Sequence, residues 1–182
     1  MGQFFVTAKV PKLDGLRLKN GSSRKLFNEL VAANPDLRIE RTADGEVIVM
    51  APAHSRTAHL NARLTQHLLN WADRDGKGQG FDSSNGYNLP NGANRGPDAS
   101  WVLNSRLDAL TPEQRDGFLP LCPDFVIELR SKSDRLSTVK AKMREYIENG
   151  VKLGWLIDPL KRSVLIYRPG VEPEHLSAPE AV

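Results

Sequence analysis

Several kinds of chemistry are excluded by what the 182-residue sequence lacks. It has a single cysteine, Cys122, so no disulfide can form within the chain and no zinc cluster can be built on cysteine thiolates. No apolar run reaches the roughly 18 residues of a membrane-spanning helix. The first residues also lack the pattern of a secretory signal peptide. We therefore expect no membrane association, and the lone thiol suits the reducing cytoplasm.

The excess of one sign of charge over the other is small as well. The chain has 25 lysines and arginines against 22 acidic residues, a formal net charge of +3. So small a surplus permits nucleic acid as a partner but does not indicate it. The Gly-x-Ser-x-Gly signature of a serine nucleophile is absent. Gly76, Gly78 and Gly80 do not precede a convincing helix, so a phosphate-cradling loop is not indicated either.

What is present is enough apolar material for a core, with 40% hydrophobic and 26% charged residues. The chain length suits one domain with short terminal segments. The pattern predicts, in chain order, a helix from Ser23 to Asn34, a hairpin over 37–50 around Asp44-Gly45, a long helix after Pro52, a strand over 99–103, a strand over 125–129, a helix from Ser133 to Asn149, and strands over 153–157 and 163–167. This order predicts an α/β or α+β domain with a mixed sheet flanked by helices. The segment 125–157 is typical of a parallel strand–helix–strand crossover.

Two acids fall where acids are costly. Asp98 directly precedes the strand at Ala99, and Glu128 lies within the apolar run Phe125–Leu129. A carboxylate in such a place has to be paired, protonated or bound to a metal. If the two meet, a divalent cation relieves their repulsion, and oxygen-only ligands suit Mg²⁺ or Mn²⁺. Spacing alone leaves open that each acid ends its strand in solvent or pairs with an arginine.

Other residues could support these two acids. Lys140 and Lys142 flank the apolar stripe of the predicted helix on opposite sides, so helical geometry does not choose between them as a catalytic cation. Glu40 ends a short predicted strand, where it could equally pair with a nearby arginine. We interpret Asp124, at the start of its strand after Pro123, as structural.

Several segments resemble the bacterial family of putative restriction endonucleases, which belongs to the PD-(D/E)XK nuclease superfamily. These segments are Phe81–Tyr87, Leu89–Gly92, Pro97–Val102, Ala109–Gln114, Pro123–Ser131 and Lys142–Val151. The resemblance runs from about Leu26 to Gly170 and implies a restriction-endonuclease-like fold. We therefore predict a domain over 26–170, preceded by an N-terminal extension over 1–25. The proline- and acid-containing segment 171–182 is expected to be a loose tail.

The resemblance also implies roles for individual residues. Asp98 and Glu128 match the two motif acids and would bind Mg²⁺ or Mn²⁺ for cleavage of DNA. The superfamily usually has lysine two residues after the second acid, where this chain has Arg130. Lys142 matches the lysine of the following helix that is thought to replace it. Glu40 resembles an additional acid ahead of the hairpin turn, and a homodimer is expected by analogy.

Two departures from the family pattern keep an alternative open. Besides Arg130, the chain has His54-Ser55-Arg56 near the place where many relatives have a glutamate. The alternative is a catalytically degenerate module of the same fold that binds nucleic acid or another protein. Uptake of a divalent cation distinguishes the two hypotheses, because a binding module does not need one.

Overall fold

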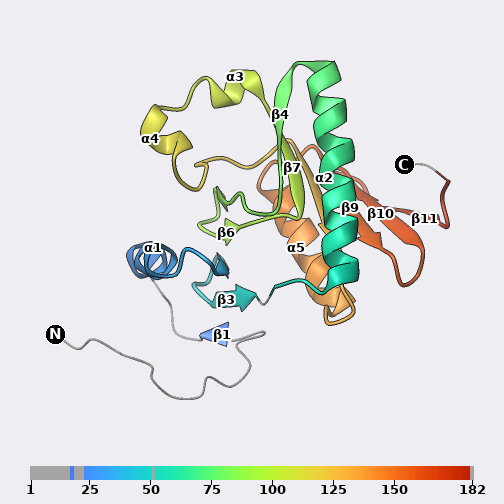
Figure 1. Cartoon of the computed structure of the whole chain (residues 1–182), viewed down its shortest axis with the longest axis horizontal. Coiled ribbons are helices and arrows are strands. Elements are labelled where there is room, and N and C mark those ends of the chain that lie inside the picture. The colour runs from blue at the N-terminus through green and yellow to red at the C-terminus, as the bar shows by residue number, and fades with distance from the viewer. Residues whose placement is uncertain (1–16, 19–22, 51, 181–182) are drawn as a thin grey trace. The chain divides into compact units, whose positions relative to one another are not determined.

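The computed structural model describes residues 17–18, 23–50 and 52–180. The chain divides into two compact units, Met1–Pro52 and Ala53–Val182. Figure 1 shows the elements in chain order, coloured from blue to red. The division falls inside the domain expected over 26–170. The two units are described separately below.

The smaller unit is built on the predicted hairpin. Its elements are β1 (Arg17–Leu18), α1 (Arg24–Ala33), β2 (Arg38–Arg41) and β3 (Val47–Met50). Strand β3 pairs antiparallel with both β1 and β2. The Ser23 side chain accepts a hydrogen bond from the backbone N–H of Leu26 at 3.2 Å and caps α1, as predicted. Gly45 has φ 90°, which explains the glycine at the hairpin turn.

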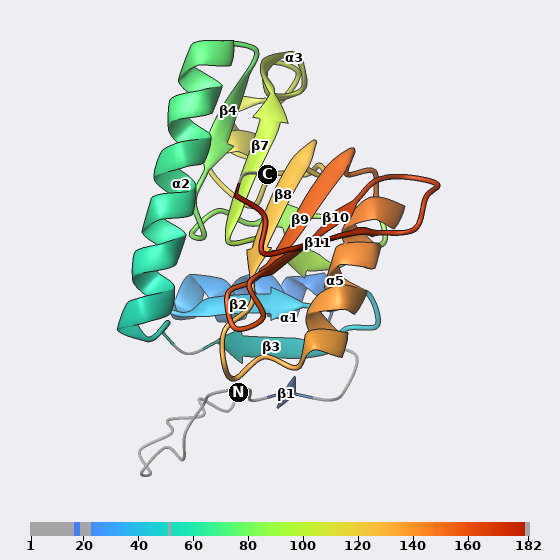
Figure 2. The same cartoon turned by 90° about the vertical axis from the view of Figure 1, so that its right-hand side faces the viewer.

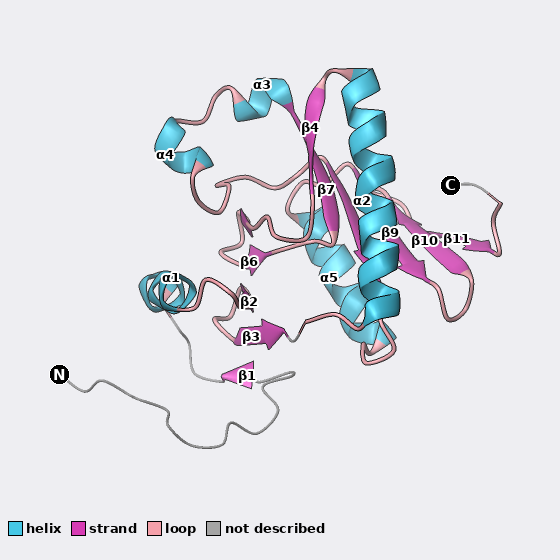
Figure 3. Cartoon of the chain, viewed as in Figure 1, coloured by secondary structure: helices cyan, strands magenta, loops and turns pink. Residues whose placement is uncertain are grey.

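The larger unit holds a six-stranded mixed sheet. Its elements are α2 (Ser55–Asp75), β4 (Gly78–Phe81), β5 (Tyr87–Asn88), β6 (Asn94–Arg95), β7 (Ala99–Leu103), α3 (Asn104–Leu107), α4 (Pro112–Arg115), β8 (Phe125–Leu129), α5 (Leu136–Glu148), β9 (Leu153–Asp158), β10 (Ser163–Tyr167) and β11 (Glu174–Ser177). The strand order is β11-β10-β9-β8-β7-β4. Strands β8 and β9 run parallel, and the other neighbouring pairs run antiparallel. This confirms the mixed sheet and the parallel crossover through α5 (Figure 3).

Two long helices cover the two faces of this sheet. Leu68 and Ala72 of α2 pack with the odd-numbered residues Ala99, Trp101 and Ile127. On the other face, α5 packs with even-numbered residues, among which are Val102, Val126 and Leu156. Side chains alternate between the faces of a strand, so the two clusters lie on opposite sides of the sheet. Figure 2 shows the strands between the two helices, as the predicted α/β architecture requires.

Two local predictions need correction. The segment 171–182, expected to be loose, contains strand β11, which pairs with β10 through Leu176 and Val164. The helix expected from Ser133 begins instead at Leu136. The reason is that the Asp134 carboxylate accepts a hydrogen bond from the backbone N–H of Ser131 at 2.7 Å, which forms a turn in place of a helix cap.

Candidate active site

Asp98 lies immediately before β7, with its carboxylate against strand β8. Its Oδ2 atom accepts a hydrogen bond from the backbone N–H of Leu129 at 2.8 Å. Its own backbone N–H donates to the carbonyl of Ile127 at 3.1 Å. The side chain is buried. Ile127 and Leu129 are the residues directly before and after Glu128 in β8. Asp98 is therefore held beside Glu128.

Glu128 is buried within β8 and contacts two side chains of α5. Its Oε1 atom lies 2.7 Å from Lys142 Nζ and accepts a hydrogen bond from the Tyr146 hydroxyl at 3.2 Å. Lys142 Nζ also donates to the carbonyl of Gly96 at 3.3 Å, two residues before Asp98. The lysine thus joins Glu128 to the segment that carries Asp98. Three predicted site residues come together in the larger unit.

Asn61 of α2 is a neighbour of this group that sequence reasoning missed. Its Nδ2 atom lies 3.4 Å from Asp98 Oδ1. Asn61 precedes Leu64 by three residues and Leu68 by seven, which places it on the helix face that packs on the sheet. A polar residue within an apolar stripe was the available signal. Tyr146 is a buried residue of α5, and nothing in its sequence position indicates that its hydroxyl reaches Glu128.

The donor atoms suit a hard divalent cation bound by two carboxylates. Within the described ranges, no group of three or more His, Cys, Asp or Glu side chains is arranged to hold a metal. Mg²⁺ commonly takes one or two carboxylates and keeps several waters, so Asp98 and Glu128 are sufficient in number. Asn61 Oδ1 is buried and has no hydrogen-bond partner among the described residues. The oxygen-rich surroundings therefore fit Mg²⁺ or Mn²⁺ and not a softer metal.

Arg130, which stands where the superfamily usually has lysine, belongs to a structural ion pair. Its Nη1 atom lies 2.7 Å from Asp158 Oδ2, and both side chains are largely buried. Burial by itself would raise the pKa of Asp158. Hydrogen bonds from Arg130 and from the backbone of Lys161 and Leu160 outweigh it and hold the pKa below its usual value.

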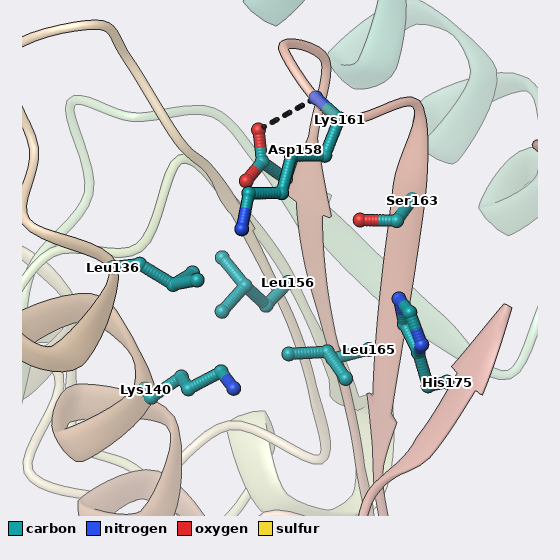
Figure 4. Close-up of a pocket in the computed structure, with 8 residues that line it drawn as sticks. All are labelled: Leu136, Lys140, Leu156, Asp158, Lys161, Ser163, Leu165 and His175. Carbon is teal, nitrogen blue, oxygen red and sulfur yellow. Dashed lines mark hydrogen bonds between the residues drawn. The ribbon is translucent and has the colours of Figure 1, made fainter. Parts of the chain in front are cut away.

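The second candidate lysine, Lys140, lies at a different place. It lines a cavity of about 320 Å³ formed by α5, β9, β10 and β11. Figure 4 shows its side chain near Leu156 and Leu165, with His175 on the adjoining strand. The structure therefore brings Lys142, and not Lys140, to Glu128.

The remaining acids differ in their surroundings. Asp124 is buried, lies 2.9 Å from Arg106 Nη1 and accepts a hydrogen bond from the backbone N–H of Leu103. These contacts agree with the structural interpretation of Asp124. Glu40 is buried in β2 of the smaller unit, and its assignment as an additional acid stays a prediction.

Comparison with known proteins identifies the family. The model of the Uma2 family, described as "Putative restriction endonuclease", matches residues 25–182. The chain belongs to the Uma2 family. No match is found among curated proteins, and no helix within the described residues is long and apolar enough to cross a membrane.

Two solved structures are similar to this Uma2 chain. One is a putative nuclease belonging to DUF820 from Anabaena variabilis, with 22% identity, a TM-score of 0.67, and coverage of 79% of this chain and 78% of that chain. The other is the DrdV–DNA complex, with 13% identity, a TM-score of 0.43, and coverage of 66% of this chain and 10% of that chain. The first similarity supports the restriction-endonuclease-like fold.

Proposed function

We propose that this protein is a Mg²⁺-dependent endonuclease that hydrolyses phosphodiester bonds of DNA. The observation that carries the proposal is the contact of Lys142 with Glu128 and Gly96, which gathers an ammonium group and two buried carboxylates in one place. Membership of a family described as restriction endonucleases supports the same reaction. Mn²⁺ would serve in place of Mg²⁺, because both prefer oxygen ligands.

Each residue has a distinct role in this proposal. Asp98 and Glu128 hold the cation, and Tyr146 orients Glu128 through its hydroxyl. When bound, the cation supplies a more acidic water and neutralises charge on the phosphate. Lys142 orients the attacking water or donates to the phosphate oxygens as negative charge develops on them. Glu40 is proposed as an outer ligand on the basis of the family resemblance.

A cleavage assay tests the proposal directly. Supercoiled plasmid and single-stranded DNA are incubated with the protein and Mg²⁺ or Mn²⁺. We expect metal-dependent cleavage that falls by roughly a hundredfold or more in Asp98→Asn, Glu128→Gln and Lys142→Met, since each removes a group acting on the transition state. Lys140→Met is the matched control on the same helix and should cleave like the wild type. Equal cleavage by the wild type and all three site variants would contradict the assignment.

The non-enzymatic module remains the second candidate, and the departures at Arg56 and Arg130 favour it. It predicts that DNA affinity falls as salt rises, without cleavage and without uptake of Mg²⁺. Calorimetric titration with Mg²⁺ therefore separates the two candidates. If the enzyme cuts both strands, two active sites are needed, and we propose a homodimer for that reason. Sedimentation as a monomer at all working concentrations would oppose the dimer.

A further inference from the structure

Asn61 carries a buried polar atom that the contacts of the protein do not satisfy. Its Oδ1 atom is buried and has no hydrogen-bond partner among the described residues. A buried hydrogen-bond acceptor without a partner destabilises the folded protein. In native structures such an atom commonly has a partner other than a protein group, and a bound ion is one such partner. The same amide group lies beside Asp98 through its Nδ2 atom, so an ion held by Asp98 would account for this buried oxygen.

The contact that Asn61 does make is weak. Its Nδ2 atom lies 3.4 Å from Asp98 Oδ1, beyond the usual 2.7–3.2 Å of a good N–H···O hydrogen bond. Asp98 obtains a shorter bond, 2.8 Å, from the backbone N–H of Leu129 through its other oxygen. The amide of Asn61 therefore does little to hold Asp98 in place, and its burial beside a carboxylate is not accounted for by this hydrogen bond.

The two ends of an asparagine amide have nearly the same shape and opposite polarity. Beside a carboxylate without a cation, the amide presents Nδ2, because two oxygens would repel each other. Beside a carboxylate that holds a cation, the favourable end is Oδ1. Rotation about the last side-chain bond exchanges the two ends, and this torsion has a broad distribution. Asn61 can therefore present its Nδ2 atom to Asp98 when no cation is bound and its Oδ1 atom to the cation when one is bound.

We propose that Asn61 supplies a third protein oxygen to the divalent cation held by Asp98 and Glu128. This inference rests on the proposed function, since it assumes that cation. It accounts for a metal site with only two carboxylates, because the third protein ligand is a neutral amide and not an acidic, histidine or cysteine side chain. A neutral carbonyl oxygen is an ordinary ligand for hard divalent cations.

The test measures Mn²⁺ affinity of the full-length protein by calorimetry, with no dependence on cleavage. We expect Asn61→Leu to weaken Mn²⁺ binding by roughly ten- to hundredfold, the range seen when a supporting group of a metal site is removed. Asn61→Asp should bind Mn²⁺ at least as tightly as the wild type, because it keeps an oxygen and adds a charge. Asn70→Leu, on the exposed surface of the same helix, is the matched control and should not change the affinity.

The outcomes separate this inference from the proposed function. Mn²⁺ binding by the wild type with equal affinity in Asn61→Leu would overturn the role of Asn61 and leave the metal site standing. Absence of Mn²⁺ binding by the wild type would overturn both. If Asn61→Leu does not fold, Asn61→Asp decides: weaker Mn²⁺ binding than the wild type would show that the amide acts only as a donor to Asp98 and would overturn the inference.

Discussion

At the scale of single residues, the buried carboxylates of the larger unit differ in their cationic partners. Asp124 and Asp158 are each paired with an arginine, at 2.9 and 2.7 Å. Glu128 is paired with a lysine. A guanidinium is a permanent, planar partner that suits a fixed structural pair, whereas an ammonium is a compact charge that can move and serve in chemistry. This difference separates the two structural acids, Asp124 and Asp158, from Glu128, which is one of the proposed catalytic acids.

The ion pair of Arg130 gives a first prediction. Arg130→Met should lower the free energy of unfolding by roughly 3 kcal/mol, because it leaves Asp158 buried without its guanidinium. The pKa of Asp158 is depressed in the folded protein. Its stabilising effect is therefore present above the unfolded pKa, near 4, and is lost as the pH falls through the folded pKa. Urea denaturation at pH 7 and at about pH 3 should show that the difference between variant and wild type shrinks in acid.

A second substitution tests whether Arg130 has the catalytic role of the lysine that the superfamily usually has at this position. We expect Arg130→Lys to cleave DNA no faster than the wild type, since the side chain is turned toward Asp158. Lys132→Met, at an exposed neighbour, is the control for general charge effects. A gain in metal-dependent cleavage by Arg130→Lys would show that the residue serves catalysis.

Cys122 gives a prediction for alkaline pH. Burial raises the pKa of its thiol from 9.0 to about 12, and Arg106 only partly opposes this. The unfolded chain ionises the thiol first, so stability is complete below about pH 9 and is lost as the pH rises toward 12. We expect a loss of roughly 1 kcal/mol between pH 9 and pH 10. Cys122→Ala should flatten this part of the curve, and an unchanged slope in denaturant unfolding would contradict the assignment to Cys122.

At the scale of elements, two glycines should differ in their tolerance of a methyl group. A Cβ on Gly154 of β9 would lie 2.5 Å from Met143 Cε, the flexible end of a side chain. A Cβ on Gly78 of β4 would lie 2.3 Å from the backbone carbonyl of Val102 and 2.4 Å from the Trp101 ring. We expect Gly78→Ala to cost about 3 kcal/mol or more and Gly154→Ala about 1–2 kcal/mol, because backbone yields less than a side-chain tip.

Denaturant unfolding of both variants checks this ranking. Met143→Ala is the companion change, since it removes the atoms that a methyl group on Gly154 would meet. It should make the cost of Gly154→Ala smaller while leaving that of Gly78→Ala unchanged. The opposite ranking would mean that strand β4 can shift at the edge of the sheet.

Elements with strong apolar patterns were predictable, and those formed by pairing alone were not. Strand β8 and the hairpin of β2 and β3 follow from apolar runs and a glycine turn. Strand β11 consists of Glu174–Ser177, whose side chains are mostly exposed. It exists because its backbone pairs with β10, and backbone pairing has no side-chain signature. For the same reason the sequence predicts a loose tail for the C-terminal segment.

At the scale of the whole molecule, a substitution of Glu40 tests whether a residue of the smaller unit takes part in catalysis. The family resemblance assigns it as an outer ligand. Glu40→Gln keeps the shape and removes the charge. We expect it to raise the Mg²⁺ concentration for half-maximal cleavage by roughly ten- to hundredfold, the usual effect of losing an outer partner of a metal site. Glu29→Gln, on the exposed surface of α1, is the control, and an identical Mg²⁺ dependence in Glu40→Gln would remove Glu40 from the site.

The sequence by itself determined which strand Asp98 precedes, which strand carries Glu128 and which helix follows that strand, because apolar periodicity, turn residues and family motifs are local. Only the tertiary structure decided among side-chain partners. Lys142 and Lys140 are equivalent on a helix diagram, and the packing of α5 on the sheet brings Lys142 to Glu128. Asn61 reaches Asp98 across 37 positions of the chain. Such contacts depend on how helices are placed on the sheet, which the burial of the whole core sets and no short segment encodes.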